Sequence, residues 1–462
     1  MLAKLKKKYI GDWDFYQKYL LLAIPMILQN AITNLVSFLD NIMVGQLGTE
    51  QMSGVAIVNQ LIFVYNLAIF GAVSAASIFG AQYFGKGNHK GHMYSFRFKL
   101  YATLLVTGGA ILLFLTKGSA LISLYLTDTV GNGATDLALQ YGLEYLAIMM
   151  VGLIPFAVNQ SYATNIKETG QTFIPMLASF VAVGTNAILD YLMIFGIGPF
   201  PELGVQGAAL ATVIARYIEA LIVVIWAHIH RGKNRYLEGA YTGFGIPLAE
   251  LKAILIKGFP LMMNEVLWAA GMTTVTQCYS VRGLNVVAGL NIASTITNLF
   301  NIVYLQLGSC ISIVVGQYLG AGKLEDAKDA DNKMIVFSVF CCVIMAALMF
   351  VVGGFFPGIY NTTEEIRELA TSFIAVSAII MPFCAFSHAS YFTLRSGGKT
   401  VVTFLFDSVF TWVIVVPAAY LLAHFTGLGI VSIYFLVQGT ELIKVIIGYL
   451  MVKSNVWVVQ MV

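Results

Sequence analysis

Long apolar stretches are the feature of this sequence that most limits its fold. Twelve of them reach about 20 residues, the length that crosses the hydrocarbon core of a bilayer as a helix. They cover approximately residues 18–42, 54–83, 98–116, 138–165, 172–197, 203–229, 252–280, 287–319, 333–355, 368–394, 400–424 and 428–451. The sequence therefore predicts an all-α polytopic membrane protein with twelve transmembrane helices.

Composition agrees with this class and excludes others. Hydrophobic residues make up 58% of the chain and charged residues 11%, and the mean hydropathy of +0.81 is far above that of soluble domains. A net charge of +3 is too small to indicate a nucleic-acid-binding protein. The five cysteines include no Cys-x-x-Cys pair and lie mostly in apolar stretches, so neither disulfides nor a structural zinc site is expected.

The basic residues are sorted between alternate loops. The loop after the second span is assigned four of them, Lys86, Lys90, Arg97 and Lys99. Further clusters follow spans 6 and 8, whereas the opposite loops hold only Lys117, Arg282 and Arg367. Loops rich in Lys and Arg remain in the cytoplasm by the positive-inside rule. Both termini and the loop after span 6 are therefore predicted to be cytoplasmic.

An internal repeat divides the chain into two halves. Pro25 aligns with Pro260 at an offset of 235, and at the same offset the segment GAQYFGKG matches VGQYLGAG. Agreement in one register over so long a stretch indicates two homologous six-helix bundles. Because the offset spans an even number of helices, both halves have the same orientation, which is typical of some transporters. The predicted organisation is an N-lobe at 1–229, a cytoplasmic linker at 230–251 and a C-lobe at 252–462, with a cavity between the lobes.

Polar residues inside three apolar stretches form the strongest candidate site. Asn186 and Asp190 lie four residues apart on span 5 and so share a helix face. Asp40 lies toward the outer end of span 1, and Thr212 lies in the outer half of span 6. An ionisable residue within a membrane span is a functional-site hypothesis by default, because its burial is expensive. Such oxygen ligands suit a hard cation, and two close carboxylates can instead share a proton. The alternative is that each carboxylate is only hydrogen-bonded within a packed bundle.

Motifs in these spans resemble the multidrug and toxic compound extrusion (MATE) family of the MOP flippase superfamily, in its bacterial form. The resemblance covers essentially the whole chain and is carried by SFLDNIMVGQLG, by GQYxGxG in both halves, and by NAILDYLMIFG, GVQGAALAT and GFPLMMNE. It implies a V-shaped pair of bundles that exports organic cations in exchange for Na⁺ or H⁺, without any other cofactor. The cation site that the resemblance implies in the N-lobe consists of Asp40, Asn186, Asp190, the backbone carbonyl of Ala208, and Thr212.

The C-lobe is similar to the family in fewer positions. Glu265 falls on an acidic position that the family often shows in span 7, and it is the repeat partner of Asn30. Some branches also carry an aspartate in span 10, where this chain has no carboxylate, so a sodium site in this lobe is in doubt. With Met262 and Trp268, Glu265 can offer a charged and polarizable wall to a flat cation in the substrate cavity. The alternative is ordinary packing.

Other charged residues within the spans are interpreted as structural. Arg216 and Glu219 on span 6, and Glu441 and Lys444 on span 12, are three residues apart and are predicted to form ion pairs. His388 on span 10 is predicted to be hydrogen-bonded within the bundle rather than a titrating group of the transport path.

The predicted function is a cation-coupled antiporter for multidrug efflux that works by alternating access. An enzyme is not expected, because HExxH and GxSxG motifs are absent from the sequence and its SGGKT segment lacks the leading glycine of a phosphate-binding loop. Its partners would be small organic cations and the lipid bilayer, not nucleic acid. We expect a monomer in the bacterial inner membrane. The alternative functions are a flippase or exporter of a lipid-linked or other amphiphilic metabolite, and a channel, which would need no coupling carboxylates.

The charge distribution predicts where a reagent outside the cell can react. A cysteine introduced in the linker at 230–251, in a chain without its five native cysteines, should resist a membrane-impermeant maleimide in intact cells. It should react once the cells are opened. Lys117→Cys is the control, because it should react from outside. Labelling of the linker in intact cells would show that the orientation is reversed.

Overall fold

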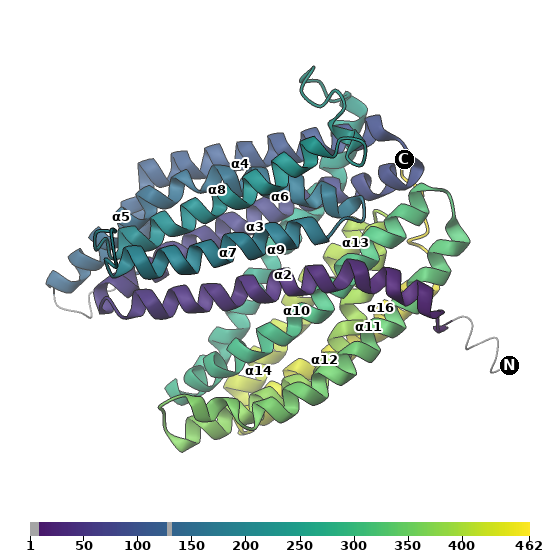
Figure 1. The fold of residues 1–462 in the computed structure, drawn as a ribbon. Coiled ribbons are helices and arrows are strands. Elements are labelled where there is room, and N and C mark those ends of the chain that lie inside the picture. Colours follow the sequence, from purple (N-terminus) through teal and green to yellow (C-terminus); the bar gives the residue numbers. More distant parts are fainter. Residues whose placement is uncertain (1–8, 127–131) are drawn as a thin grey trace. The chain divides into compact units, whose positions relative to one another are not determined.

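The computed structural model describes residues 9–126 and 132–462, with side chains except at 36–38 and 132–134. Within these ranges the regular elements are all helical (Figure 1). Eleven helices are long and apolar enough to cross a membrane, and a bent pair of shorter helices raises the number to twelve. The predicted all-α membrane fold is confirmed for this part of the chain.

The elements follow the repeat of the sequence. Those of the first half are α2 (Trp13–Gly45), α3 (Thr49–Lys86), α4 (His89–Ser123), α5 (Asn132–Val151), α6 (Leu153–Glu168), α7 (Phe173–Ile194) and α8 (Val205–Ile229), followed by the short turn η1 (Arg235–Leu237). Those of the second half are α9 (Leu248–Ser280), α10 (Leu284–Gly320), α11 (Leu324–Gly353), η2 (Phe356–Ile359), α12 (Glu364–Ser396), α13 (Thr400–Phe404), the π-helical turns η3 (Leu405–Val409) and η4 (Thr411–Val415), α14 (Val416–Phe425), α15 (Ile430–Gly439) and α16 (Glu441–Lys453).

The predicted spans coincide with helices, but the third and fourth differ in detail. Helix α4 begins at His89, so Arg97 and Lys99 are buried helical residues and not loop residues as predicted. Their charges are tolerated there because partners inside the protein compensate them, as Glu168 does for Lys99. The fourth span is the bent pair α5 and α6, which meet at 44°. Pro155 in the first turn of α6 cannot donate to the preceding turn, which explains the break.

Two compact units make up the described chain. Unit 1 contains the described residues up to Ile27, Ala81–Asn88 and Ala253–Val462, and unit 2 contains Leu28–Gly80 and His89–Lys252. These bounds differ from the repeat boundaries, because short parts of α2 and α3 pack with the second half. The division into 1–229, 230–251 and 252–462 remains a prediction from the repeat.

The two copies of the GQY signature contact each other within unit 1. A side chain at Gly85 would collide with the backbone of Gln317, and one at Gly320 would collide with the backbone of Gln82. The two contacts are reciprocal, because both pairs of equivalent positions are 235 residues apart. Each helix then ends at a glycine with positive φ (73° and 74°), which a larger residue adopts only with strain. Both copies of the signature therefore require glycine where their helices contact each other.

The first part of the predicted linker packs against α4 in unit 2. The Arg97 guanidinium donates at 2.7 to 2.9 Å to three carbonyl oxygens of this segment, those of Gly239, Ala240 and Gly245. Tyr236 is 1% exposed, and its ring centroid lies 4.8 Å from that of His92. Burial raises the pKa of the Tyr236 hydroxyl well above its usual range. The segment is therefore an ordered part of this unit.

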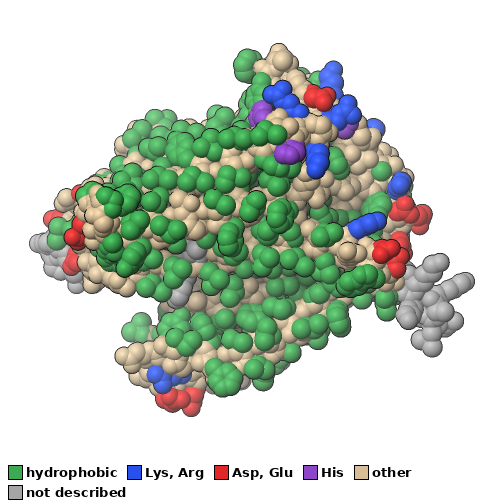
Figure 2. All heavy atoms as spheres, in the orientation of Figure 1, with side chains coloured by type: hydrophobic (Ala, Val, Ile, Leu, Met, Phe, Trp, Pro, Cys, Tyr) green, Lys and Arg blue, Asp and Glu red, His purple; other side chains and the backbone are tan. Residues whose placement is uncertain are grey.

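Much of the outer surface of the helices is apolar. Figure 2 shows hydrophobic side chains over most of the visible face, with few charged groups between them. In unit 2, for example, Leu105, Leu115 and Phe180 are largely exposed. Exposed apolar surface of this extent is unusual for a soluble protein and suits contact with lipid.

Helices α7 and α8 are in close contact where α8 begins. A Cβ atom at Gly207 would lie 2.6 Å from the carbonyl oxygen of Met193. Ile194 next to it is completely buried in the apolar core of unit 2. This contact holds Asp190 on α7 and Thr212 on α8 within about one or two helical turns of the same point.

Replacing Gly207 with alanine should destabilise the protein, because the new methyl group meets backbone atoms that cannot move aside. Overpacking of this kind typically costs about 1–3 kcal/mol, which should appear as a lower melting temperature of the purified protein in detergent. Gly184→Ala on α7 is the control, since no heavy atom outside its own helix backbone lies within 4 Å of that Cβ position. If both variants melt at the same temperature, the close α7–α8 contact is not important for stability.

Candidate functional site

Two carboxylates meet within unit 2. Asp40 lies near the end of α2, and Asp190 lies near the end of α7. Their carboxyl groups are within hydrogen-bonding reach of each other. Asp190 is 1% exposed. Neither of its carboxyl oxygens, nor Oδ1 of Asp40, accepts a hydrogen bond from a donor among the described residues. Two charges of the same sign in such a place require a cation or a proton to compensate them.

Asn186 and Thr212 belong to the same group. Asn186 lies one turn before Asp190 on the same helix. It donates through Nδ2 to Oγ1 of Thr212 on α8, at 3.5 Å. Ala208 is buried one turn before Thr212, and in a helix its carbonyl points along the axis towards that residue. The structure thus brings together the four predicted side chains and places Ala208 on the adjacent turn.

Tyr145 on α5 is a neighbour that the sequence analysis missed. It is buried and lies close enough to Asp40 and Asp190 to interact with them electrostatically. Its hydroxyl donates to Oδ1 of Asn59 on α3, at 3.3 Å. A single tyrosine in an apolar stretch has the same pattern as a packing residue, so only the tertiary structure distinguishes it.

The oxygen ligands that this group offers suit a hard cation or a proton. Carboxylate, amide, hydroxyl and carbonyl oxygens are the ligands that such cations prefer, whereas His and Cys, which transition metals favour, do not occur among the predicted residues. The oxygens of Asp40 and Asp190 without donors show where positive charge is needed.

Within the described residues, the predicted pairs in span 6 and span 12 are not direct ion pairs, although the two charges of each pair interact electrostatically. Arg216 lies over the ring of Phe156, 5.1 Å from its centroid, and Glu219 instead accepts a hydrogen bond from Ser179. Lys444 forms its direct ion pair with Asp407, at 2.9 Å, and the charge of Glu441 interacts with it without a direct contact. Spacing of i,i+3 only makes contact possible, and in a bundle a neighbouring helix can offer a better-placed partner.

Corresponding spans of the two halves form two similar polar triads, one in each unit. Each joins an amide near the middle of the first helix of its half to side chains on the fifth and sixth spans. The triads are Gln29, Ser179 and Glu219 in unit 2, and Asn264, Asp407 and Lys444 in unit 1. Gln29 donates to Ser179 at 2.7 Å, and Asn264 donates to Asp407 at 3.0 Å. The sequence analysis missed Asp407, although a carboxylate inside a predicted span was the available signal.

The residues predicted to line the cargo cavity are divided between the units. Asn30 lies in unit 2, whereas Glu265, Met262 and Trp268 lie on α9 in unit 1. Glu265 is half-buried, with Arg395 and Asp407 as its charged neighbours. Met262 and Trp268 are each 38% exposed. Their place in a cavity remains a prediction.

His388 is hydrogen-bonded within the bundle, as predicted. Its Nδ1 lies 2.9 Å from the carbonyl oxygen of Cys384, one turn earlier on α12. Its ring centroid lies 4.7 Å from that of Tyr304 on α10. These contacts hold the imidazole between two helices of unit 1.

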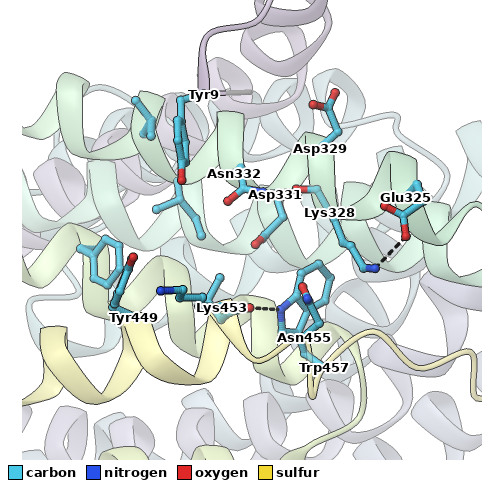
Figure 3. Close-up of a pocket in the computed structure, with 14 residues that line it drawn as sticks. Tyr9, Glu325, Lys328, Asp329, Asp331, Asn332, Tyr449, Lys453, Asn455 and Trp457 are labelled. Atoms are coloured by element: carbon cyan, nitrogen blue, oxygen red, sulfur yellow. Dashed lines mark hydrogen bonds and ion pairs between the residues drawn. The ribbon is translucent and has the colours of Figure 1, made fainter. Parts of the chain in front are cut away.

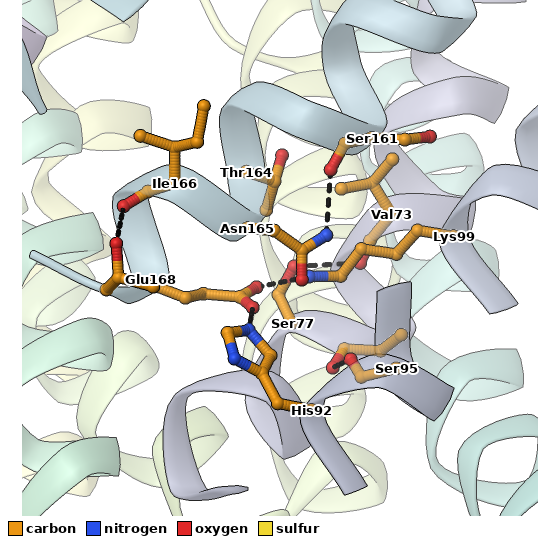
Figure 4. A network of polar contacts seen from close by, with 12 residues as sticks. Val73, Ser77, His92, Ser95, Lys99, Ser161, Thr164, Asn165, Ile166 and Glu168 are labelled. Carbon is orange, nitrogen blue, oxygen red and sulfur yellow. Dashed lines mark hydrogen bonds and ion pairs between the residues drawn. The ribbon is translucent and has the colours of Figure 1, made fainter. Parts of the chain in front are cut away.

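A buried charged network lies at the other end of unit 2. Figure 4 shows the carboxylate of Glu168 between Lys99 and His92. Lys99 Nζ lies 2.5 Å from Oε1, and His92 Nε2 lies 3.3 Å from Oε2. Gly80 provides the room, because a side chain there would collide with this carboxylate. The sequence predicts a loop at Lys99 and therefore does not indicate this network.

Comparisons with known proteins agree with this architecture. A model of the MatE family matches residues 25–192 and 260–421. The probable multidrug resistance protein NorM of Thermotoga maritima is 23% identical over 413 residues, which are 89% of this chain and 86% of the relative. The probable multidrug resistance protein YoeA of Bacillus subtilis is 22% identical over 443 residues, with 94% and 92% covered.

Solved structures of transporters share the fold. A MOP superfamily transporter from Pyrococcus furiosus superposes with a TM-score of 0.85 at 20% identity and covers 97% of each chain. A multidrug resistance MATE family transporter in an outward-facing conformation also gives 0.85 at 20% identity, with 96% of each chain covered. Because the family match extends over both halves and more than half of the residues, the chain belongs to the MatE family, a family of membrane transporters and not of enzymes.

Proposed function

We propose that this transporter exports organic, mostly cationic and amphipathic compounds in exchange for Na⁺ or H⁺. Family membership supports transport, and relatives named as multidrug resistance proteins support a range of small organic compounds as cargo. The main support for ion coupling is the close approach of the Asp40 and Asp190 carboxyl groups. Three of their four oxygens have no hydrogen-bond donor among the described residues.

Without a bound cation or a shared proton, the two carboxylates would repel each other. Two unit charges about 4 Å apart repel by about 4 kcal/mol at an effective dielectric constant of about 20. A sodium ion held by both carboxylates removes this repulsion, and a proton shared between them removes one of the charges. Asn186 and Thr212, which touch each other at the same place, would supply further oxygens to sodium. The backbone carbonyl of Ala208 would supply another.

Loading of the pair can bias the packing of the helices. Asp40 is on α2 and Asp190 is on α7, so repulsion between them acts to separate these helices and neutralisation lets them approach. An ion with different affinities for two arrangements shifts their populations by that difference. Coupling then requires that cargo favours the arrangement that the ion does not.

Glu265 is the proposed contact for cationic cargo. It lies on α9 with Met262 and Trp268, at spacings of three residues that bring the side chains to one side of the helix. The partly exposed indole and thioether offer polarizable surface to a flat cation, and the carboxylate offers charge.

We also propose the location and the state in which the protein works. The basic loops support cytoplasmic termini in the inner membrane of a bacterium. A complete pair of six-helix halves in one chain supports a functional monomer.

Changing Asp190 to asparagine should abolish coupling but leave the fold intact, because the side chain keeps its shape and loses its charge. Uphill efflux of ethidium from intact cells should fall about tenfold or more, a loss of at least about 1.4 kcal/mol in driving interaction. Asp40→Asn should behave in the same way. Asn186→Ala should have a smaller effect, since it removes a neutral ligand.

The control for these variants is Asp136→Asn, which changes an exposed carboxylate of the same unit. Its efflux should equal that of the unmodified protein. Collapsing the sodium gradient and the pH gradient separately identifies the coupling ion. The coupling assignment is wrong if Asp190→Asn protein, present at normal levels, expels dye uphill at the native rate.

Changing Glu265 to glutamine should reduce efflux of cationic dyes more than efflux of neutral compounds. The substitution removes one attraction for positive charge and keeps the size and hydrogen-bonding capacity of the side chain. Rates for a matched cationic and neutral pair, measured in the same cells, provide the readout. An equal loss for both compounds would mean that Glu265 supports folding or coupling and not cargo recognition.

A further inference from the structure

A cavity of about 470 Å³ lies within unit 1, separate from the Asp40–Asp190 pair (Figure 3). Its walls come from the first turns of α11, Phe386 of α12, the end of α16, the segment that follows α16, and Tyr9. The charge distribution predicts that this end of the helices faces the cytoplasm. Polar and aromatic side chains both line it, which is typical of a site for a small amphipathic molecule.

Most of the charges around the cavity neutralise each other. Lys328 pairs with Glu325 at 2.7 Å, and Lys333 pairs with Asp329 at 2.5 Å. Lys453 at the rim is exposed and lies 5.5 Å from the ring centroid of Tyr449, without an ion pair among the described residues. The charge that these contacts leave inside the cavity wall is that of Asp331.

Asp331 is a buried carboxylate with only one of its two oxygens bonded. The residue has no exposed surface. Its Oδ1 accepts a hydrogen bond from Oγ1 of Thr393 at 2.5 Å, whereas Oδ2 has no donor among the described residues. In Figure 3 its carboxyl group points from α11 towards the side of the cavity formed by Lys453 and Asn455. A buried charge in this state is expensive unless a donor reaches it, and a charged donor compensates it best.

The wall opposite α11 is held in place before any ligand binds. Asn455 adopts a positive φ of 55°, which turns the chain back after α16. Trp457 is then 1% exposed, and its indole nitrogen donates to the carbonyl oxygen of Val452 at 3.1 Å. Further along, the backbone amide of Met461 donates to Oε1 of the buried Gln82 at 2.8 Å. A cavity with fixed walls loses little entropy when it takes up a ligand.

We propose that this cavity binds a protonated primary or secondary amine that carries a small apolar body. The ammonium N–H would donate to Oδ2 of Asp331, and the apolar body would lie along Phe386, Ile335 and Tyr449. A quaternary ammonium has no N–H and would leave Oδ2 without a donor. Two sources offer this chemistry: a free amine, and the headgroup of an aminophospholipid, whose phosphate could reach Lys453. The proposal does not depend on the function of Asp40 and Asp190.

Calorimetry on the purified full-length protein tests the proposal with phenethylamine as the probe. In nanodiscs of phosphatidylcholine alone, phenethylamine should bind, and its N,N,N-trimethyl analogue should bind at least about tenfold more weakly, because a hydrogen bond to a charged group contributes about 1.5–3 kcal/mol. Asp331→Asn should remove binding. Asp326→Asn is the matched control on the same helix and should bind normally, since Asp326 is exposed and does not line the cavity.

Two further variants separate folding and transport from binding. Val336→Trp should block binding by filling the cavity without touching the charge, and Val336 is exposed enough for the change to be tolerated. Asp190→Asn should bind phenethylamine like the unmodified protein, so failure of the coupling proposal leaves this one unaffected. Equal binding by the unmodified protein, Asp331→Asn and Val336→Trp would overturn the site.

A last comparison identifies the source of the amine. Adding phosphatidylethanolamine to the nanodiscs should weaken phenethylamine binding if the lipid headgroup occupies the cavity, and should leave it unchanged if the natural ligand is a free amine. Asp331→Asn should abolish any such competition. If the unmodified protein binds neither phenethylamine nor phosphatidylethanolamine, Oδ2 of Asp331 is satisfied by water alone and the proposal is wrong.

Discussion

Burial of charge among apolar helices is the constraint on which the rest of this structure depends. In the described part of the chain, buried charges are accommodated in two ways. Lys99 with Glu168, and Lys444 with Asp407, are compensated inside the protein, and such pairs connect helices without needing anything else. Asp190 and Asp331 keep oxygens without a donor. The first kind holds the bundles together, and the second kind is the basis of the two sites proposed above.

The repeat provides the same framework twice with different chemistry. In both units an amide near the middle of the first span bonds to the fifth span, through Ser179 in one half and Asp407 in the other. Only the second of these carries a charge, and a lysine neutralises it. The shared framework preserves the orientation of the helices, whereas the substitutions make the halves unequal. The proposed exchange of ion for cargo would need such an inequality, since the two must be recognised differently.

Hydropathy was sufficient to predict the number and type of the spans, because a helix is the economical way to satisfy backbone hydrogen bonds in hydrocarbon. Hydropathy was insufficient to predict the residues at which the helices begin and end. Lys99 looked like a loop residue because its partner, Glu168, lies 69 positions away in the sequence. The predicted Arg216–Glu219 and Glu441–Lys444 pairs failed for the related reason that neighbouring helices offered other partners.

The sequence by itself determined the all-helical membrane class, the repeat, and the placement of Asn186 and Asp190 on one face of a helix, because these depend on local composition and on spacing along one helix. The resemblance to a known family then named Asp40 and Thr212 as their companions. Only the tertiary structure decided that Asp40 reaches Asp190, that Lys444 makes its direct ion pair with Asp407, and that Asp331 lies in the wall of a cavity. Those contacts join residues far apart in the chain, and the packing of helices against one another, which no single helix encodes, sets them.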